Sequence, residues 1–284
     1  MPSSTPSLVG ETGRFTVRRR IGTGAYADVF EALDRKSQQR VALKLVRSHS
    51  RTSPERSILE REFATLQRIR HPSLARCYEL FLEDRDAFFT MELVEGSGFV
   101  EYVRADARRE LPGSDFMACS EQGIVRLRTA LPQLVRGIDA LHAAGVVHRD
   151  LHPGNVRVTF GGRVVVIDYG LASDQGTDPA AATSATVMGS AAYAAPEQHE
   201  HTREPASDWY SVGVLLFESL TGGRPFAGND HEVFVRKRTL AAPTARSLVP
   251  SVPEDLDRLC SALLERDPGA RPDANAILTR LEGG

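Results

Sequence analysis

The stretch from His148 to Asn155 constrains the fold of this chain more than any other part of the sequence. It follows a run with helical periodicity and precedes an apolar, strand-like run from Val156 to Phe160. A second strand-like run, Val164 to Ile167, leads directly into another acid. Two carboxylates and an amide therefore stand at the ends of short strands, on loops that can converge on one point: Asp150, Asn155 and Asp168.

Such a set suits phosphoryl transfer, which needs one carboxylate to orient a hydroxyl and an amide with a second carboxylate to hold Mg²⁺. The order His-Arg-Asp, then Asn, then Asp-Tyr-Gly resembles the catalytic and metal-binding loops of eukaryotic-type protein kinases. The resemblance implies that Asp150 is the catalytic base and that Asn155 and Asp168 hold Mg²⁺. Tyr169 replaces the usual Phe of that motif.

The segment from Gly22 to Val29 resembles the glycine-rich loop that covers ATP phosphates in that family. Glycines let backbone N–H groups approach a phosphate, although a glycine pair alone is more typical of a hairpin turn. Further along, Val41-Ala42-Leu43-Lys44 supplies the strand lysine that would contact the phosphates, with Glu62 as its partner on the next helix. The resemblance assigns the nucleotide contacts to Gly22, Gly24, Val29, Ala42, Lys44, Met91 and the backbone of Glu92 to Val94.

The later part of the chain resembles other kinase segments. The run from Gly189 to Glu197 resembles the end of an activation segment, and Asp208 to Gly213 resembles the start of the main large-lobe helix. The resemblance implies a buried ion pair between Glu197 and Arg271, whose loss of one partner would cost about 3–5 kcal/mol. Ser190 and Pro153 favour the Ser/Thr branch of the family.

In the family that the chain resembles, an arginine such as Arg149, beside the catalytic Asp150, implies control by phosphorylation of the activation segment. A phosphate carries about −1.5 to −2 charges at pH 7, which such an arginine can pair. Thr186 stands at the usual distance before Glu197, and the alternatives are Thr177, Thr183 and Ser184.

Two residues depart from the Ser/Thr kinase pattern. His152 stands where the family carries a lysine that neutralises the γ-phosphate, and Asp-Leu-His-Pro-Gly-Asn also resembles the loop of small-molecule kinases of the aminoglycoside and choline kinase type. Arg157 stands where a Leu usually forms the floor under adenine. Its guanidinium could stack on the base for about 0.5–2 kcal/mol, crowd the pocket, or turn outward.

The order of elements predicts an α+β, bilobal protein-kinase fold. We expect strands over Phe15–Phe30, Val41–Val46 and Ala87–Val94, and one helix over Pro54–Arg70. From Gly96 onward the pattern is mostly helical, and the expected helices cover about Phe99–Arg108, Gln122–Ala143, Ser207–Thr221, His231–Thr239, Asp255–Glu265 and Asp273–Leu281. Pro132 predicts a kink or a late start in the helix of residues 122–143. The expected domains are a flexible lead-in (1–13), an N-lobe (14–94), a hinge (95–98) and a C-lobe (99–284).

Composition excludes several classes of function. The net charge of −2 gives no bulk attraction to nucleic acid, and the two Arg/Lys runs, 18–20 and 236–238, are typical of solvated faces. No apolar run reaches the roughly 18 residues of a membrane span. The three separate cysteines indicate free thiols in a reducing compartment, so we expect a cytoplasmic protein.

The sequence therefore predicts a Ser/Thr protein kinase, more similar to bacterial than to metazoan ones, with ATP, Mg²⁺ and a protein substrate as its partners. Self-association would permit autophosphorylation. No nucleic-acid or membrane partner is expected. Two alternatives stay open at this point: a pseudokinase that acts as a binding or scaffolding module, because of His152 and Arg157, and a small-molecule kinase, because of the loop at His152.

Overall fold

The computed structural model describes residues 13–23, 27–46, 54–82, 87–107, 116–169, 191–198 and 204–283, apart from the side chains of 54–58 and 62. The described residues fall into two compact units. One contains residues up to 70 together with 74–94, and the other contains 71–73 and the described residues from 95 onward. The first unit is rich in strands and the second is mainly helical, so the predicted α+β class is confirmed.

The first unit is built on a five-stranded antiparallel sheet with the strand order β1-β2-β3-β5-β4. The predicted strands are present, and one further strand, β4, was not predicted. Its sequence, CYELFL, has a run of three apolar residues after Glu79, so it lacks the alternation expected of a half-buried strand. The strands are β1 (Phe15–Thr23), β2 (Ala27–Asp34), β3 (Gln39–Val46), β4 (Cys77–Leu82) and β5 (Ala87–Glu92).

One face of this sheet carries a compact aromatic and aliphatic cluster, which includes Phe15, Phe30, Leu43 and Phe88. Phe15 meets the ring of Phe88 edge-on at 5.9 Å between centroids. Because successive side chains of a strand point to opposite faces, the residues that alternate with these point to the other face of the sheet.

Helix α1 (Pro54–Arg68) packs on that other face. Its Phe63 is buried, and the ring lies 5.7 Å from the ring of Phe89 on β5. Leu59 and Leu66 are also buried, at the spacing that one face of a helix requires. The helix ends slightly before the predicted Arg70.

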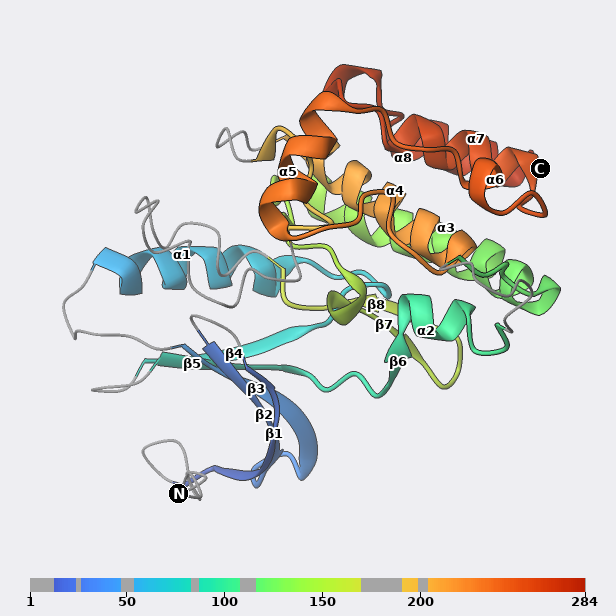
Figure 1. Ribbon diagram of the computed structural model, residues 1–284. Coiled ribbons are helices and arrows are strands. Elements are labelled where there is room, and N and C mark those ends of the chain that lie inside the picture. Colours follow the sequence, from blue (N-terminus) through green and yellow to red (C-terminus); the bar gives the residue numbers. More distant parts are fainter. Residues whose placement is uncertain are drawn as a thin grey trace. The chain divides into compact units, whose positions relative to one another are not determined.

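The second unit combines a small sheet with a bundle of helices (Figure 1). Its sheet has the antiparallel order β6-β7-β8. The strands are β6 (Gly96–Gly98), β7 (Val156–Thr159) and β8 (Val164–Val166), and the helices are α2 (Phe99–Val103), α3 (Glu121–Ala143), α4 (Pro205–Thr221), α5 (Asp230–Thr239), α6 (Ala245–Leu248), α7 (Glu254–Leu263) and α8 (Ala274–Glu282), with 3₁₀ turns η1 (Pro153–Asn155) and η4 (Pro268–Ala270).

Helix α4 forms the centre of the helical bundle and contacts α2, α3, α6 and α7 (Figure 1). Almost all of its residues are buried. Two of its buried hydroxyls bond inside the helix: Ser219 donates to the Leu215 carbonyl at 2.7 Å and Thr221 to the Phe217 carbonyl at 2.8 Å. At Gly213 a Cβ atom would lie 2.8 Å from the Cβ of Leu263, so glycine permits the close approach of α7.

The helix predictions for the second unit are confirmed, with small shifts at the ends, except at two places. Helix α2 ends at Val103, earlier than the predicted Arg108. Helix α3 begins at Glu121 and continues through Pro132, so a late start at that proline is wrong. Residues 96–98, predicted as part of a hinge, form β6 in the second unit.

The structure also bears on two predictions from composition. Cys77, Cys119 and Cys260 are all free thiols, as expected. Among the described residues, no helix is both long enough and apolar enough to cross a bilayer.

Candidate active site

In the first unit, the residues predicted to hold a nucleotide lie on one face of the sheet. Gly22 pairs with Val29, and Val29 pairs in turn with Lys44. Ala42 pairs with Met91 on β5. Paired residues of an antiparallel sheet point to the same face, so all these positions lie opposite the aromatic cluster. Lys44 and Met91 are buried there.

Two predicted members of this set, Gly24 and the side chain of Glu62, lie outside the described part of the chain. The pairing of Lys44 with Glu62 therefore stays a prediction. Glu92 ends β5, and its N–H donates to the Arg76 carbonyl at 2.8 Å. Val94 is the last residue of the first unit.

In the second unit, the loop that carries Asp150 is held by the carboxylate of Asp208, at the start of α4. Asp208 is fully buried and accepts the backbone N–H groups of His148 and Arg149, each at 2.8 Å. It also lies 2.8 Å from Nε2 of His142 on α3. Arg149 has a φ of 66°, a left-handed conformation that is unfavourable for a residue other than glycine. The hydrogen bond from its N–H to Asp208 stabilises this turn.

His148 joins this loop to the strand before Asp168. Its Nδ1 accepts the N–H of Asp150 at 3.3 Å, so Nε2 carries the proton and donates to the Ile167 carbonyl at 3.2 Å. Ile167 in turn donates its N–H to the Asn155 carbonyl at 2.9 Å. The structure thus brings Asp150, Asn155 and the backbone next to Asp168 into one network.

Asn155 and Asp168 have the donor chemistry that Mg²⁺ requires. Asn155 is buried, and its Nδ2 donates to the Asp150 carbonyl oxygen at 2.9 Å, which leaves the amide oxygen Oδ1 for a cation. Asp168 adopts a φ of 62°, again left-handed. No group of three or more His, Cys, Asp or Glu suited to a metal occurs among the described residues.

His152 lies beside Asp150 at the start of η1. Its Nδ1 accepts the N–H of Gly154 at 3.1 Å, and its Nε2 lies 3.7 Å from Oδ2 of Asp150. The hydrogen bond from Gly154 indicates that the proton of the neutral imidazole is on Nε2 and faces the carboxylate.

Arg157, on β7, is half-buried, and its guanidinium donates to the carbonyl oxygen of Gly96. This contact holds the end of the Arg157 side chain against β6, and its relation to adenine stays a prediction. Gly96 is required here, because it has a φ of 149° and a Cβ atom would lie 1.9 Å from the Val158 carbonyl oxygen.

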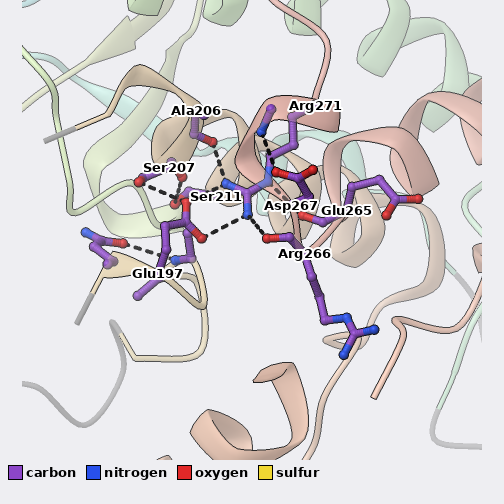
Figure 2. Close-up of polar contacts among 12 residues, drawn as sticks. Glu197, Ala206, Ser207, Ser211, Glu265, Arg266, Asp267 and Arg271 are labelled. Atoms are coloured by element: carbon purple, nitrogen blue, oxygen red, sulfur yellow. Dashed lines mark hydrogen bonds and ion pairs between the residues drawn. The ribbon is translucent and has the colours of Figure 1, made fainter. Parts of the chain in front are cut away.

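Glu197 and Arg271 form the predicted ion pair (Figure 2). The guanidinium binds both carboxylate oxygens, at 2.6 and 2.9 Å. Its other donors reach backbone carbonyls, and Ser207 donates to Glu197 at 3.1 Å. Burial alone would raise the pKa of Glu197, but the hydrogen bonds and charge of Arg271 hold it below its ordinary value. The carbonyls that accept from Arg271 are those of Ala206, Glu265 and Arg266.

The sequence reasoning missed two residues that fix residues 191–198. The amide of Gln198 donates to the Arg149 carbonyl and accepts the Ala195 N–H at 3.0 Å. Lys237, interpreted above as part of a solvated run, is only 2% exposed, so that interpretation is wrong for this residue. Its spacing from the buried Val233 on the same helix was the available signal. Thr186 lies outside the described residues.

Comparison with known proteins agrees with this geometry. The model of the family described as "Protein kinase domain" matches residues 15–280. The chain belongs to the protein kinase domain family.

Curated relatives include three bacterial proteins named serine/threonine-protein kinases. PknA of Mycobacterium tuberculosis (strain H37Rv) is 34% identical over 280 residues, covering 94% of this chain and 61% of PknA. PknL of the same organism is 32% identical over 275 residues, covering 95% of this chain and 65% of PknL. The DNA damage-responsive kinase RqkA of Deinococcus radiodurans is 31% identical over 285 residues, covering 99% of this chain and 40% of RqkA. The chain thus spans less than two thirds of each relative.

Among solved structures, that of Rad53 residues 1–466 in complex with AMP-PNP has a TM-score of 0.73 with 24% identity. The match covers 95% of this chain and 65% of the Rad53 chain. At this identity the likeness supports the fold, and it agrees with the strand-rich and helical units described above.

Proposed function

We propose that this chain transfers the γ-phosphoryl group of ATP to Ser or Thr hydroxyls of protein substrates, with Mg²⁺. The observation that carries the proposal is the setting of Asp150: its side chain is 51% exposed, while the loop beneath it is fixed by the buried Asp208, His148 and Asn155. A carboxylate that is open to a substrate but rigidly held suits a base that orients a hydroxyl. The relatives named above carry the Ser/Thr assignment.

In this proposal each residue has a defined role. Asp150 orients the acceptor hydroxyl and takes its proton, and Asn155 and Asp168 hold Mg²⁺, which neutralises charge on the phosphates. His152 presents its Nε2 proton beside Asp150, where the family carries a lysine. The residues proposed to hold ATP are Gly22, Gly24, Val29, Ala42, Lys44, Glu62 (as the partner of Lys44), Met91, Arg157 and the backbone of Glu92 to Val94.

The decisive test uses purified protein, γ-labelled ATP and Mg²⁺, with site mapping by mass spectrometry. Wild-type protein should label Ser or Thr residues of itself or of an added protein. Asp150→Asn should lower the rate about 10²–10⁴-fold, the usual contribution of a general base. Asp106→Asn, an exposed acid in the same unit, is the matched control and should transfer phosphate normally. Equal rates in Asp150→Asn and wild type would contradict the assignment.

Control by phosphorylation is part of the same proposal. A phosphate on Thr186 would be paired by the guanidinium of Arg149, which is half-buried next to Asp150. Thr186→Ala should then lower the specific activity, whereas Thr177→Ala should not. The same specific activity in Thr186→Ala and wild type would remove this part.

A pseudokinase remains the second candidate because of Arg157, whose side chain takes the place of an apolar one and binds the Gly96 carbonyl. Mg·ATP decides between them in a melting experiment. A ligand at 100 times its Kd stabilises the protein by about 2.7 kcal/mol, which shifts Tm by several degrees. No shift, together with no labelling, would favour the pseudokinase. Transfer to a metabolite but to no protein would favour a small-molecule kinase.

A further inference from the structure

Lys237 lies in an unusual place for a lysine. Its neighbours in the sequence, Arg236 and Arg238, are exposed, but Lys237 points to the buried side of α5. Removing an ammonium group from water is unfavourable unless other groups replace the lost hydrogen bonds. The contacts of Lys237 therefore show what keeps it there.

A single atom of Lys237 joins two points of one backbone segment. Its Nζ donates to the Ala191 carbonyl at 2.5 Å and to the Ala194 carbonyl at 2.6 Å. The ammonium also lies 5.7 Å from the centre of the Tyr210 ring, within the range of a cation–π contact. The side chain thus closes a short loop, residues 191–194, against helices α4 and α5.

The same segment borders the loop of Asp150. The ring of Tyr193 lies 6.4 Å from that of His152, two residues after Asp150. Gln198, at the end of the segment, donates to the carbonyl of Arg149, just before Asp150. Residues 191–198 therefore contact the chain on both sides of Asp150, at His152 and at Arg149.

Two further bonds hold Tyr193, in the middle of the segment. Its carbonyl accepts the hydroxyl of Ser211 at 2.9 Å, and its own hydroxyl donates to Glu218 at 2.7 Å. Burial, with the bond to Glu218, raises the pKa of Tyr193, so it stays a donor at neutral pH. These bonds fix the residue between the two carbonyls, and Lys237 fixes the carbonyls themselves.

We propose that Lys237 is a positioning residue that shapes residues 191–194 into the part of the surface that receives the phosphoacceptor. This inference rests on the proposed kinase function. Lys237 acts through the backbone of the segment and touches neither ATP nor the reacting atoms. Its amine and its ammonium forms both have enough N–H groups for the two carbonyls, so the positioning works in either form.

The test compares Lys237→Met, which keeps the apolar stem but removes the donors, with Arg238→Met, which removes an exposed cation from the next position. The acceptor is a catalytically blocked Asp150→Asn copy of the chain, so KM for acceptor and KM for ATP are measured in one assay. We expect Lys237→Met to raise KM for the acceptor about tenfold, with KM for ATP and the Arg238→Met values unchanged.

A second readout does not depend on activity. Amide hydrogen exchange should become faster in residues 191–198 of Lys237→Met, while β7 and α3 keep wild-type rates. Unchanged exchange in this segment, or an equal loss of affinity for ATP and acceptor, would overturn the proposal. If wild-type protein transfers no phosphate while the exchange result holds, the kinase function fails and the structural role of Lys237 stands.

Should Lys237→Met fail to fold, Lys237→Arg replaces it. The guanidinium is larger than the ammonium and its N–H directions are fixed in one plane, so it cannot take the place of Nζ without displacing residues 191–194, and acceptor KM should rise while ATP KM stays the same. Wild-type acceptor KM and wild-type exchange in a folded Lys237→Arg would also overturn the proposal.

Discussion

Arg271 gives all five N–H donors of its guanidinium to hydrogen bonds, and two of them go to the two oxygens of Glu197, 74 residues earlier in the chain. The Arg271 side chain is fully buried, and that of Glu197 nearly so. The ring of Tyr210 lies 5.0 Å from the guanidinium carbon. The pair thus connects the start of α4 with the loop that carries Glu197 and with the loop that carries Arg271.

Arg271→Met should lower the free energy of unfolding by about 3–5 kcal/mol, because it leaves the Glu197 carboxylate buried without its cation. Urea denaturation measures this loss. The control is Arg258→Met, which breaks an exposed pair with Glu254 on one helix and should change stability by less than about 1 kcal/mol. Similar losses in the two variants would show that the buried pair has no special weight.

Gly96→Ala should destabilise the second unit by roughly 3 kcal/mol or more. The new Cβ would lie 1.9 Å from the backbone oxygen of Val158, so β6 and β7 would have to separate, and the φ of 149° is itself unfavourable for alanine. Gly145→Ala is the matched control: its φ is 76°, but nothing lies within 4 Å of the added Cβ. That variant should lose only about 1 kcal/mol. Thermal melting of the two variants gives the comparison, and equal Tm values would contradict it.

Asp208→Asn should weaken both stability and phosphoryl transfer. The buried carboxylate accepts from three donors, and an amide would turn an NH₂ group toward at least one of them. We expect a loss of about 1–3 kcal/mol in the free energy of unfolding. Asp208 holds the turn at Arg149, and Asp150 is the next residue. We therefore expect kcat to fall and KM for ATP to change less. Asp106→Asn serves as the control, and an unchanged kcat in folded Asp208→Asn would show that the loop is held by other contacts.

The sequence predicted those parts of the site that depend on order along the chain. Asn155 and Asp168 lie next to strand ends, and the pairing of β7 with β8 brings them together, while Asp150 lies in the loop before η1. The Glu197–Arg271 pair was predicted in the same way, from motifs at fixed places. The direction of individual side chains was harder to predict from the sequence. Arg157 alternates with two buried valines on β7, so the pattern left open where its long side chain would go, and only the structure shows it on the Gly96 carbonyl.

Lys237 shows why composition misleads at single positions. A run of three cations is usually solvated, and two of the three are. Helical geometry puts the middle residue on the face of Val233, a placement that charge alone does not indicate. Strand β4 was missed because Leu80, Phe81 and Leu82 are three consecutive apolar residues, which breaks the alternation expected of a half-buried strand.

The burial of Lys237 has a consequence for stability that a pH series can measure. Burial lowers its pKa to about 7, the positive charge of Arg224 acts in the same direction, and Asp230 and Glu197 oppose both. In the unfolded chain the lysine keeps its ordinary pKa of about 10.4. Between these values the unfolded state binds more protons than the folded state, so the contribution of Lys237 to the free energy of unfolding rises with pH.

The difference in free energy of unfolding between wild type and Lys237→Met isolates this effect, since the variant lacks the titrating group. The wild-type minus Lys237→Met difference should increase by about 2 kcal/mol between pH 7 and pH 9. Below pH 6 it should be nearly constant, because Lys237 is protonated in both the folded and the unfolded wild type. Denaturant unfolding at a series of pH values provides the measurement. Arg238→Met, whose guanidinium stays charged throughout, should show no such slope. A wild-type minus Lys237→Met difference that is flat from pH 7 to pH 9 would mean that the two carbonyls of Ala191 and Ala194 hold the ammonium strongly enough to cancel the effect of burial.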